Sequence, residues 1–187
     1  TISNLLNILD QKKILKKRYE ILIKKNIPQK SGLGGGSMNA ACVLKFFLKN
    51  KIIQITNQEI YKICSEIGSD VFIGLDRKNS ILINKNTIKR YNFKIGLFAI
   101  LVKPKIGCST KKIYSRVKIS SKKKINSSSK VFKISSLKKQ ENDLEKPAFK
   151  LYPILGKLKN FLSNTDQVEF VRMTGSGSTI VAYFSNK

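Results

Sequence analysis

A glycine cluster near the start of the chain is the sequence feature that most constrains its fold. Residues 31–37 read Ser-Gly-Leu-Gly-Gly-Gly-Ser, so four of five consecutive positions are glycine. The preceding stretch Tyr19–Lys24 has the pattern of a strand closed by Pro28, and Asn39–Leu48 is an apolar run that predicts a buried helix. A strand, a glycine loop and a helix start present backbone N–H groups and a positive helix end to an anion. The cluster therefore predicts a phosphate-binding loop.

Two common phosphate loops do not fit this cluster. A P-loop needs Lys and then Ser or Thr after its last glycine, but here Ser37-Met38-Asn39 follows. The dinucleotide fingerprint needs a glycine where Ser37 stands, and Glu59, the acidic residue nearest the ribose-binding distance, is explained as part of a helix cap. The alternative that remains is a tight turn required only for packing.

The rest of the chain predicts a mixture of helices and strands. Thr56 and Glu59 form a capping-box pattern at the start of one helix, which Gly68 ends. The segment Lys118–Lys139 consists mostly of Lys, Ser, Ile and Val and predicts a mobile loop with a solvated basic surface. The remaining predicted helices are Ser3–Lys17 and Tyr152–Leu162, and the remaining predicted strands are Ser80–Ile83, Thr87–Tyr91, Leu97–Lys103, Val168–Met173 and Ser178–Phe184.

Composition narrows the possible chemistry. The 187 residues contain no histidine, which excludes a Ser-His-Asp triad or a His-ligated metal within them. The three cysteines form no CxxC pair and predict buried, reduced thiols. The formal charge of +26 leaves a basic RNA-binding module open as an alternative, although Lys outnumbers Arg by 32 to 5, which is not typical of bidentate phosphate recognition. No apolar run reaches membrane-spanning length and no signal pattern opens the chain, so we expect a cytoplasmic protein.

The glycine cluster resembles the second motif of the GHMP kinases. Asn26-Ile-Pro28 followed by Ser31-Gly-Leu-Gly-Gly-Gly-Ser37-Met-Asn-Ala-Ala41 is similar to that family's proline, short spacer and GLGSSAA, and the triple glycine is typical of its diphosphocytidyl-methylerythritol kinases. The resemblance implies that the ATP phosphates bind at Gly32, Gly34, Gly35, Gly36 and Ser37, and it places Asn4 and Lys25 near the nucleotide base. Met38 replaces a serine that helps to hold magnesium in many members of the family.

Asp70 is the candidate general base. It follows the helix-ending Gly68 and precedes Val71 and Phe72, so the residues alone allow either a partly desolvated base on a loop or an aspartate that only stops the helix. The segment Gly68-Ser-Asp70-Val resembles the family's G-A-D-V-P, with Phe72 in place of proline. The resemblance implies that Asp70 removes the proton from the substrate hydroxyl.

Two later motifs complete the resemblance. The run from Pro104 to Tyr114 is similar to the family's P-x-x-x-x-S-T-x-x-x-[YF], which implies that Thr110 and Tyr114 bind substrate and that Tyr114 stacks on its cytosine. From the residues alone, Thr110 predicts a helix cap and Tyr114 a core side chain. Arg172-Met-Thr-Gly-Ser-Gly177 resembles the third motif, whose loop residues here are Gly175, Ser176 and Gly177; a glycine hairpin is the alternative.

The resemblance implies a two-layer α+β GHMP kinase fold. Residues 1–92 would form part of a ribosomal-protein-S5-like, ATP-binding N-terminal domain, and residues 93–187 a ferredoxin-like C-terminal domain. It implies ATP and Mg²⁺ as cofactors and diphosphocytidyl-methylerythritol, a small molecule of isoprenoid biosynthesis, as substrate. The alternative within the family is a homoserine-type kinase. The family's opening P-A-K-x-N strand and its D-G-Y-H segment do not occur here, so we expect the chain alone to be inactive.

Overall fold

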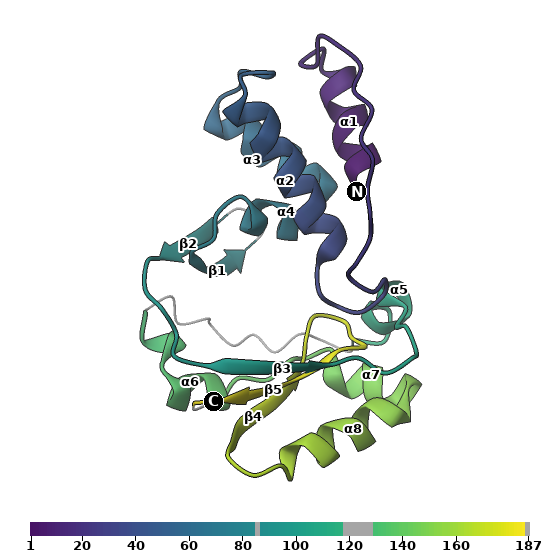
Figure 1. The fold of residues 1–187 in the computed structure, drawn as a ribbon, viewed down its shortest axis with the longest axis vertical. Coiled ribbons are helices and arrows are strands. Elements are labelled where there is room, and N and C mark those ends of the chain that lie inside the picture. Colours follow the sequence, from purple (N-terminus) through teal and green to yellow (C-terminus); the bar gives the residue numbers. More distant parts are fainter. Residues whose placement is uncertain (85–86, 118–128, 186–187) are drawn as a thin grey trace. The chain divides into compact units, whose positions relative to one another are not determined.

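The computed structural model describes residues 1–84, 87–117 and 129–185. The chain forms two compact units (Figure 1). Unit 1 contains residues 1–26 and 34–93, and unit 2 contains residues 27–33 and 94–187. A short piece of the glycine-rich segment therefore packs with residues that lie more than sixty positions later in the sequence.

Unit 1 is mainly helical. Among its described residues, four helices surround the core, and a two-stranded antiparallel sheet follows them, with Ile81 opposite Lys89. The elements are α1 (Ile2–Gln11), α2 (Gly35–Lys49), α3 (Asn57–Ile67), α4 (Ser69–Gly74), β1 (Asn79–Asn84) and β2 (Thr87–Tyr91). The core consists of one apolar face from each helix, with Leu5, Leu44 and Val71 fully buried. The apolar spacing predicted α1 and the apolar run after the glycine cluster predicted α2, but no helix was predicted at the residues of α4.

The capping box of α3 is present as predicted. The Thr56 hydroxyl accepts a hydrogen bond from the Glu59 N–H at 3.3 Å, and the Glu59 carboxylate accepts one from the Thr56 N–H at 2.7 Å. Gly68 lies at the C-terminal end of the helix. These contacts satisfy backbone donors that the first turn of a helix leaves without partners.

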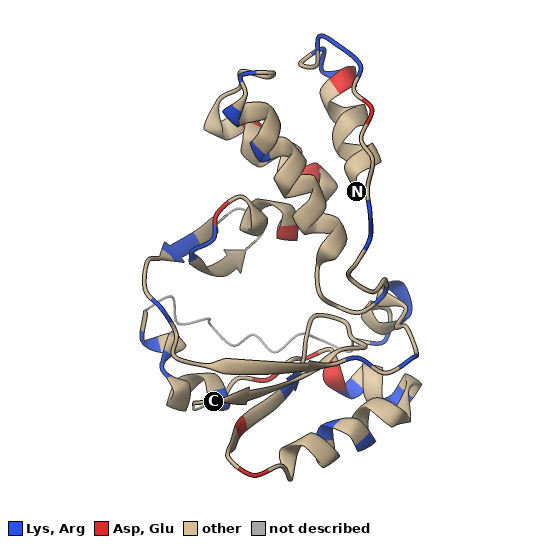
Figure 2. Cartoon of the chain, viewed as in Figure 1, with Lys and Arg blue, Asp and Glu red and all other residues tan. Residues whose placement is uncertain are grey.

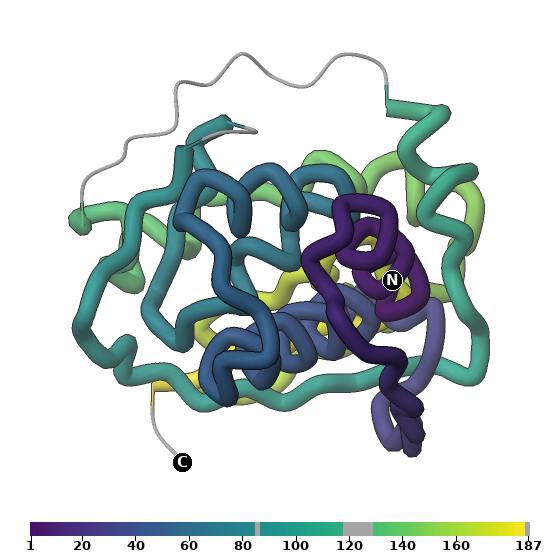
Figure 3. The backbone as a smooth tube through the Cα atoms, turned by 90° about the horizontal axis from the view of Figure 1, so that it is seen from above, coloured from purple at the N-terminus to yellow at the C-terminus, as the bar shows by residue number. Residues whose placement is uncertain are grey.

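Two expectations for the first residues are wrong. The helix α1 ends at Gln11, not at Lys17, and Lys13 follows it with a φ of 53°. Tyr19–Lys24 forms no strand in the part of the chain that the structure describes. Its backbone runs extended after α1 in Figure 1, and Figure 3 draws the same segment as a tube. Its alternating pattern does place the Tyr19 ring against Phe47, with 5.2 Å between the ring centroids, but Leu22 is 96% exposed. A strand also requires a hydrogen-bonding partner, which the pattern does not supply.

Unit 2 is an antiparallel sheet covered by helices. The sheet has the order β3 (Phe98–Val102), β5 (Ile180–Phe184), β4 (Val168–Met173), and the helices α7 (Glu145–Leu151) and α8 (Pro153–Ser163) pack on the same face (Figure 1). Pro153 occupies the first turn of α8, where its missing N–H has no cost. The core between sheet and helices includes Leu155, Met173 and Ile180. The strands and α8 confirm the predicted elements.

The basic segment Lys118–Lys139 is described only from residue 129, and residues 118–128 lie outside the described part. The prediction of a loop is wrong for residues 129–138, because Ser129–Phe132 forms a 3₁₀ helix and α6 spans Ile134–Lys138. The Arg172 guanidinium donates to the Leu137 carbonyl at 2.6 Å and also to the carbonyl of Gln140. A cation at the last carbonyls of a helix stabilises that end, and the local sequence does not reveal this contact.

Candidate active site

The open end of a helix lies at the glycine cluster. Gly34 is the N-cap of α2, with a left-handed φ of 66°, and its carbonyl accepts the first helical bond, from the Met38 N–H at 2.9 Å. No side chain caps this end, and no acidic residue lies in its first turn. A Cβ added at Gly34 would meet no atom within 4 Å, so the space beside it is open. The free N–H groups of the first turn and the helix dipole together favour an anion here.

Helix α4 packs closely on α2 because Gly74 has no side chain. A Cβ at Gly74 would lie 2.7 Å from Cε of Met38 and 2.9 Å from Cβ of Ala41. Met38 therefore directs its thioether towards α4 and serves as a packing residue. A thioether is also a poor ligand for a hard cation, so the loop offers Mg²⁺ the hydroxyl of Ser37 but nothing from Met38. The described residues contain no group of three or more His, Cys, Asp or Glu side chains that would hold a metal.

Asp70 lies in the first turn of α4, so the structure brings it onto an element that packs against the glycine-loop helix. The expectation that it lies on a loop and is partly desolvated is wrong, because its side chain is exposed and its neighbour Val71 fills the core. Successive helical residues point about 100° apart, so burial of Val71 turns Asp70 outwards. An exposed carboxylate remains available to a substrate hydroxyl.

Arg90 of β2 holds the other end of α4, a contact that the sequence analysis missed. Its guanidinium donates to the carbonyls of Phe72, at 2.7 Å, and Ile73, at 3.3 Å. It also lies 5.4 Å from the centre of the Phe72 ring, and that ring forms an edge-to-face pair with Tyr61. Phe72, which stands where the family has proline, is thus a packing residue that helps to fix the helix carrying Asp70. The sequence gives no sign of this role, because it depends on β2 lying beside the end of α4 in the fold.

Asn4 and Lys25 have exposed positions in unit 1. Asn4 lies on α1, and Lys25 lies in the extended segment before the glycine cluster. Their assignment to the nucleotide base remains a prediction.

In unit 2, Gly32 lies against the third motif. Its φ is 75°, and a Cβ there would lie 2.2 Å from the Thr174 carbonyl oxygen and 2.8 Å from the Gly177 nitrogen. The Thr174 hydroxyl donates to the Gly32 carbonyl at 3.2 Å, and the Thr179 N–H donates to the Ser31 carbonyl at 3.0 Å. This close approach of two backbones explains a glycine at position 32. A contact of Gly32 with phosphate remains a prediction.

The loop of the third motif, residues 174–177, joins β4 to β5 and contains two glycines with positive φ, Gly175 at 52° and Gly177 at 80°. The side chain of Ser176 is buried, and its hydroxyl lies 2.8 Å from that of Thr110. Thr110 begins α5 (Thr110–Tyr114), but the cap is Ser109, so the capping role predicted for Thr110 is wrong. The structure therefore brings the predicted substrate motif and the third motif into contact.

Tyr114 ends α5 with 59% of its surface exposed, while the neighbouring Ile113 is buried. The alternative that Tyr114 is a core residue is therefore wrong. Its ring is free to stack on a flat heterocycle.

The basic side chains of the described residues do not gather on one element. Lys and Arg are distributed over helices, strands and loops of both units among the described residues (Figure 2). None of the described helices is long and apolar enough to cross a membrane.

Comparison with known proteins first defines the class. Residues 2–76 match the GHMP kinases N terminal domain, and residues 130–187 match the GHMP kinases C terminal family. The first match contains the glycine cluster and Asp70, and the second contains the third motif. They confirm the α+β GHMP kinase fold and the resemblance to the GHMP kinases.

Relatives narrow the class. The chain is 49% identical to the 4-diphosphocytidyl-2-C-methyl-D-erythritol kinase of Pelagibacter ubique (strain HTCC1062), over all of this chain and 67% of that protein. It is 31% identical to the chloroplastic enzyme of that name from Arabidopsis thaliana, over 94% of this chain and 48% of that protein. The chain therefore spans about two thirds of the bacterial relative and under half of the plant one.

A crystal structure of a 4-(cytidine 5'-diphospho)-2C-methyl-D-erythritol kinase shares the fold, with a TM-score of 0.68 and 22% identity, over 96% of this chain and 66% of that one. The family matches and the sequence relatives assign the chain to one family. The chain belongs to the 4-diphosphocytidyl-2-C-methyl-D-erythritol kinase family of the GHMP kinases.

Proposed function

We propose that this chain provides the phosphate loop, the base and substrate-binding residues for transfer of the ATP γ-phosphate to a hydroxyl of 4-diphosphocytidyl-2-C-methyl-D-erythritol. This reaction is a step in the methylerythritol phosphate route to isoprenoid precursors. The observation that carries the proposal is in unit 1. The open N-terminus of α2 at Gly34, with free space beside it, belongs to a helix on which the Asp70-bearing helix packs.

The phosphate loop acts by binding and orienting ATP. The N–H groups of Gly35, Gly36 and Ser37 donate to phosphate oxygens, and the helix dipole adds positive potential at the same place. Phosphoryl transfer depends mainly on positioning and on stabilising negative charge, so such donors are sufficient for a large effect. Mg²⁺, when bound, would neutralise charge on the phosphates. With Met38 packed on α4, the loop's contribution to holding it would come from the Ser37 hydroxyl.

Asp70 acts as the general base. Its carboxylate accepts the proton of the substrate hydroxyl as the oxygen attacks the γ-phosphorus. The Arg90 contacts and the close packing of Gly74 against α2 hold the helix α4 that carries this carboxylate. In water an exposed aspartate is a weak base, so bound substrate must exclude water from it.

The remaining roles are those of the motifs. Tyr114 stacks on the cytosine ring, a contact that is typically worth about 1 to 3 kcal/mol for a nucleic-acid base. Thr110 binds the same substrate, and Asn4 and Lys25 contact the nucleotide base. The support for these roles is the resemblance together with the exposure of Tyr114 and of the residues of unit 1.

The test is phosphate transfer by the natural gene product that carries these residues, compared with its Asp70→Asn variant. We expect a loss of about 10²- to 10⁴-fold in kcat with unchanged ATP affinity, because only the proton acceptor is removed. Asp10→Asn on α1, an exposed aspartate, is the matched control and should be neutral. An Asp70→Asn enzyme with native kcat would exclude the base role. Phosphorylation of homoserine in place of the cytidine compound would move the assignment to the homoserine-type kinases.

A further inference from the structure

The third-motif loop starts at an edge of the sheet in unit 2. Because β4 is an edge strand, the outward backbone groups near its end have no strand partner among the described residues. Edge groups of this kind bind water or side chains, and whatever binds them determines where the adjoining loop lies. These groups are the N–H and the carbonyl of Met173, the last residue of β4, and the carbonyl of Gly175, which directly precedes Ser176.

Asn142 occupies part of this edge. Its Nδ2 donates to the carbonyl oxygens of Met173 and Gly175, both at 2.8 Å. Its Oδ1 accepts from the N–H of Leu144 at 3.0 Å, so the amide group is fixed from both ends. One side chain therefore joins the end of the strand to the first glycine of the loop.

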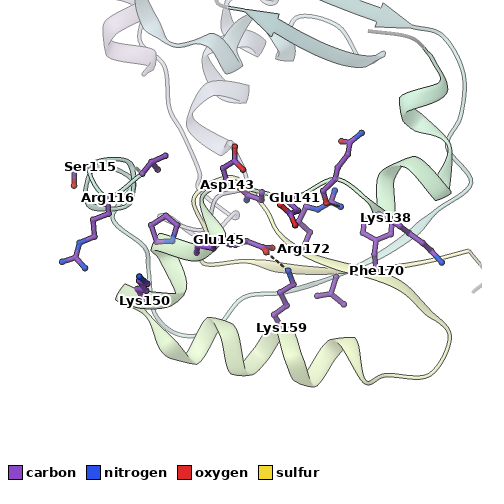
Figure 4. Close-up of a pocket in the computed structure, with 16 residues that line it drawn as sticks. Ser115, Arg116, Lys138, Glu141, Asp143, Glu145, Lys150, Lys159, Phe170 and Arg172 are labelled. Atoms are coloured by element: carbon purple, nitrogen blue, oxygen red, sulfur yellow. Dashed lines mark hydrogen bonds and ion pairs between the residues drawn. The ribbon is translucent and has the colours of Figure 1, made fainter. Parts of the chain in front are cut away.

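Glu145 occupies the neighbouring position. Its side chain is buried, and Oε1 accepts from the N–H of Met173 at 2.7 Å. Oε2 pairs with Nζ of Lys159 on α8 at 2.5 Å, the contact drawn in Figure 4. A buried carboxylate without partners is costly, so the lysine and the N–H group together hold it in place. Glu145 and Asn142 thus bind both polar groups of Met173, as a neighbouring strand would.

We propose that Asn142 and Glu145 are positioning residues for the third-motif loop. They fix Met173 and Gly175 on one side of the loop, and the hydroxyl pair of Ser176 and Thr110 fixes the other side. The role in catalysis rests on the proposed kinase function. Neither residue is required to touch substrate, but a loop displaced by even about 1 Å loses much of its effect on a transition state.

The test replaces Asn142 with aspartate, which keeps the shape but removes both donors. Asn142→Ala is a second variant that adds no charge. Asn160→Asp, at an exposed position on α8, makes the same chemical change away from the loop. In both Asn142 variants, hydrogen exchange of the amides of residues 175–177 should become about ten- to a hundredfold faster, and the amides of β3 should exchange at the rate of the unaltered protein. In Asn160→Asp, all of these amides should exchange at the rate of the unaltered protein.

The second measurement is steady-state kinetics on the natural gene product. We expect kcat to fall at least about tenfold in Asn142→Asp with KM values within about twofold, because the loop acts in the transition state. Native exchange at residues 175–177 would overturn the positioning role, whatever the enzyme catalyses. Faster exchange with native kcat would overturn its link to catalysis. If the unaltered protein transfers no phosphate, the proposed function fails, and the exchange measurement still decides the positioning role.

Discussion

Replacing Gly32 with alanine should weaken unit 2 through two separate effects. The φ of 75° is a left-handed conformation that costs an L-residue about 1 to 2 kcal/mol. The added Cβ would also lie 2.2 Å from the Thr174 carbonyl oxygen and 2.9 Å from that of Gly177. Both are backbone atoms and cannot rotate away, so we add about 1 to 3 kcal/mol for overpacking. The expected loss in free energy of unfolding is about 2 to 5 kcal/mol.

Hydrogen exchange of the core amides of β5 measures this loss, because they exchange when unit 2 opens. A loss of about 2 kcal/mol corresponds to exchange about 30-fold faster. Gly34→Ala separates the two effects, since its φ is 66° but its Cβ would meet no atom within 4 Å, and exchange in α2 should reflect backbone strain alone. Gly96→Ala, with an ordinary φ and open space, should be neutral. If Gly32→Ala exchanges like Gly96→Ala, the close packing of the two backbones is refuted.

Three further outcomes are expected from the contacts of single residues. Arg90→Lys should destabilise α4 by about 1 to 2 kcal/mol, seen as faster exchange of the α4 amides, since lysine cannot reproduce both carbonyl contacts. Hydrogen bonds from the backbone N–H of Thr56 and then from its side chain lower the pKa of Glu59 below its ordinary 4.5. The charged cap therefore stabilises α3 above pH 4.5, and this contribution is lost as the pH falls through the lowered value. Thr56→Ala removes the hydroxyl but keeps the N–H, so it should return the NMR-measured pKa only part of the way towards 4.5. Burial raises the pKa of the Cys64 thiol to about 11, so a maleimide at about pH 7 should label exposed Cys42 and leave Cys64 unmodified until the protein unfolds.

Local signals predicted the five described strands and the helices α2, α3 and α8, but not α4, α6 or α7. The Thr56 and Glu59 capping box, Pro153 at the start of α8 and the alternation in β4 and β5 each depend on neighbours in sequence. These signals act within one or two turns, so a single sequence is enough to find them.

Contacts between residues far apart in the sequence could not be predicted from these local signals. The extended segment at Tyr19 has the alternation of a strand but no partner strand among the described residues. Helix α6 lies in a segment of loop-like composition, and Arg172 holds its end from more than thirty residues away. The exposure of Asp70 depends on which face of α4 packs inwards, and the sequence did not decide that face.

In the candidate site, too, local motifs could be predicted from the sequence but contacts between distant residues could not. The motifs located Gly34, Ser176 and Thr110, because glycine and hydroxyl residues at fixed spacing are visible in the sequence. The hydroxyl pair of Ser176 and Thr110 joins positions 66 residues apart, and the edge contacts of Asn142 span about thirty. No local pattern indicates which distant side chain completes a loop.

The most direct test of the phosphate loop is an NMR titration of the ¹⁵N-labelled chain with ATP and Mg²⁺. Amide shifts should be largest at Gly35, Gly36 and Ser37, whose N–H groups begin α2 with no capping side chain. Asp70→Asn should leave these shifts intact. If ATP moves none of the three amides, or moves only amides far from the start of α2, then the glycine loop does not bind the phosphates and the kinase mechanism proposed for this chain is wrong.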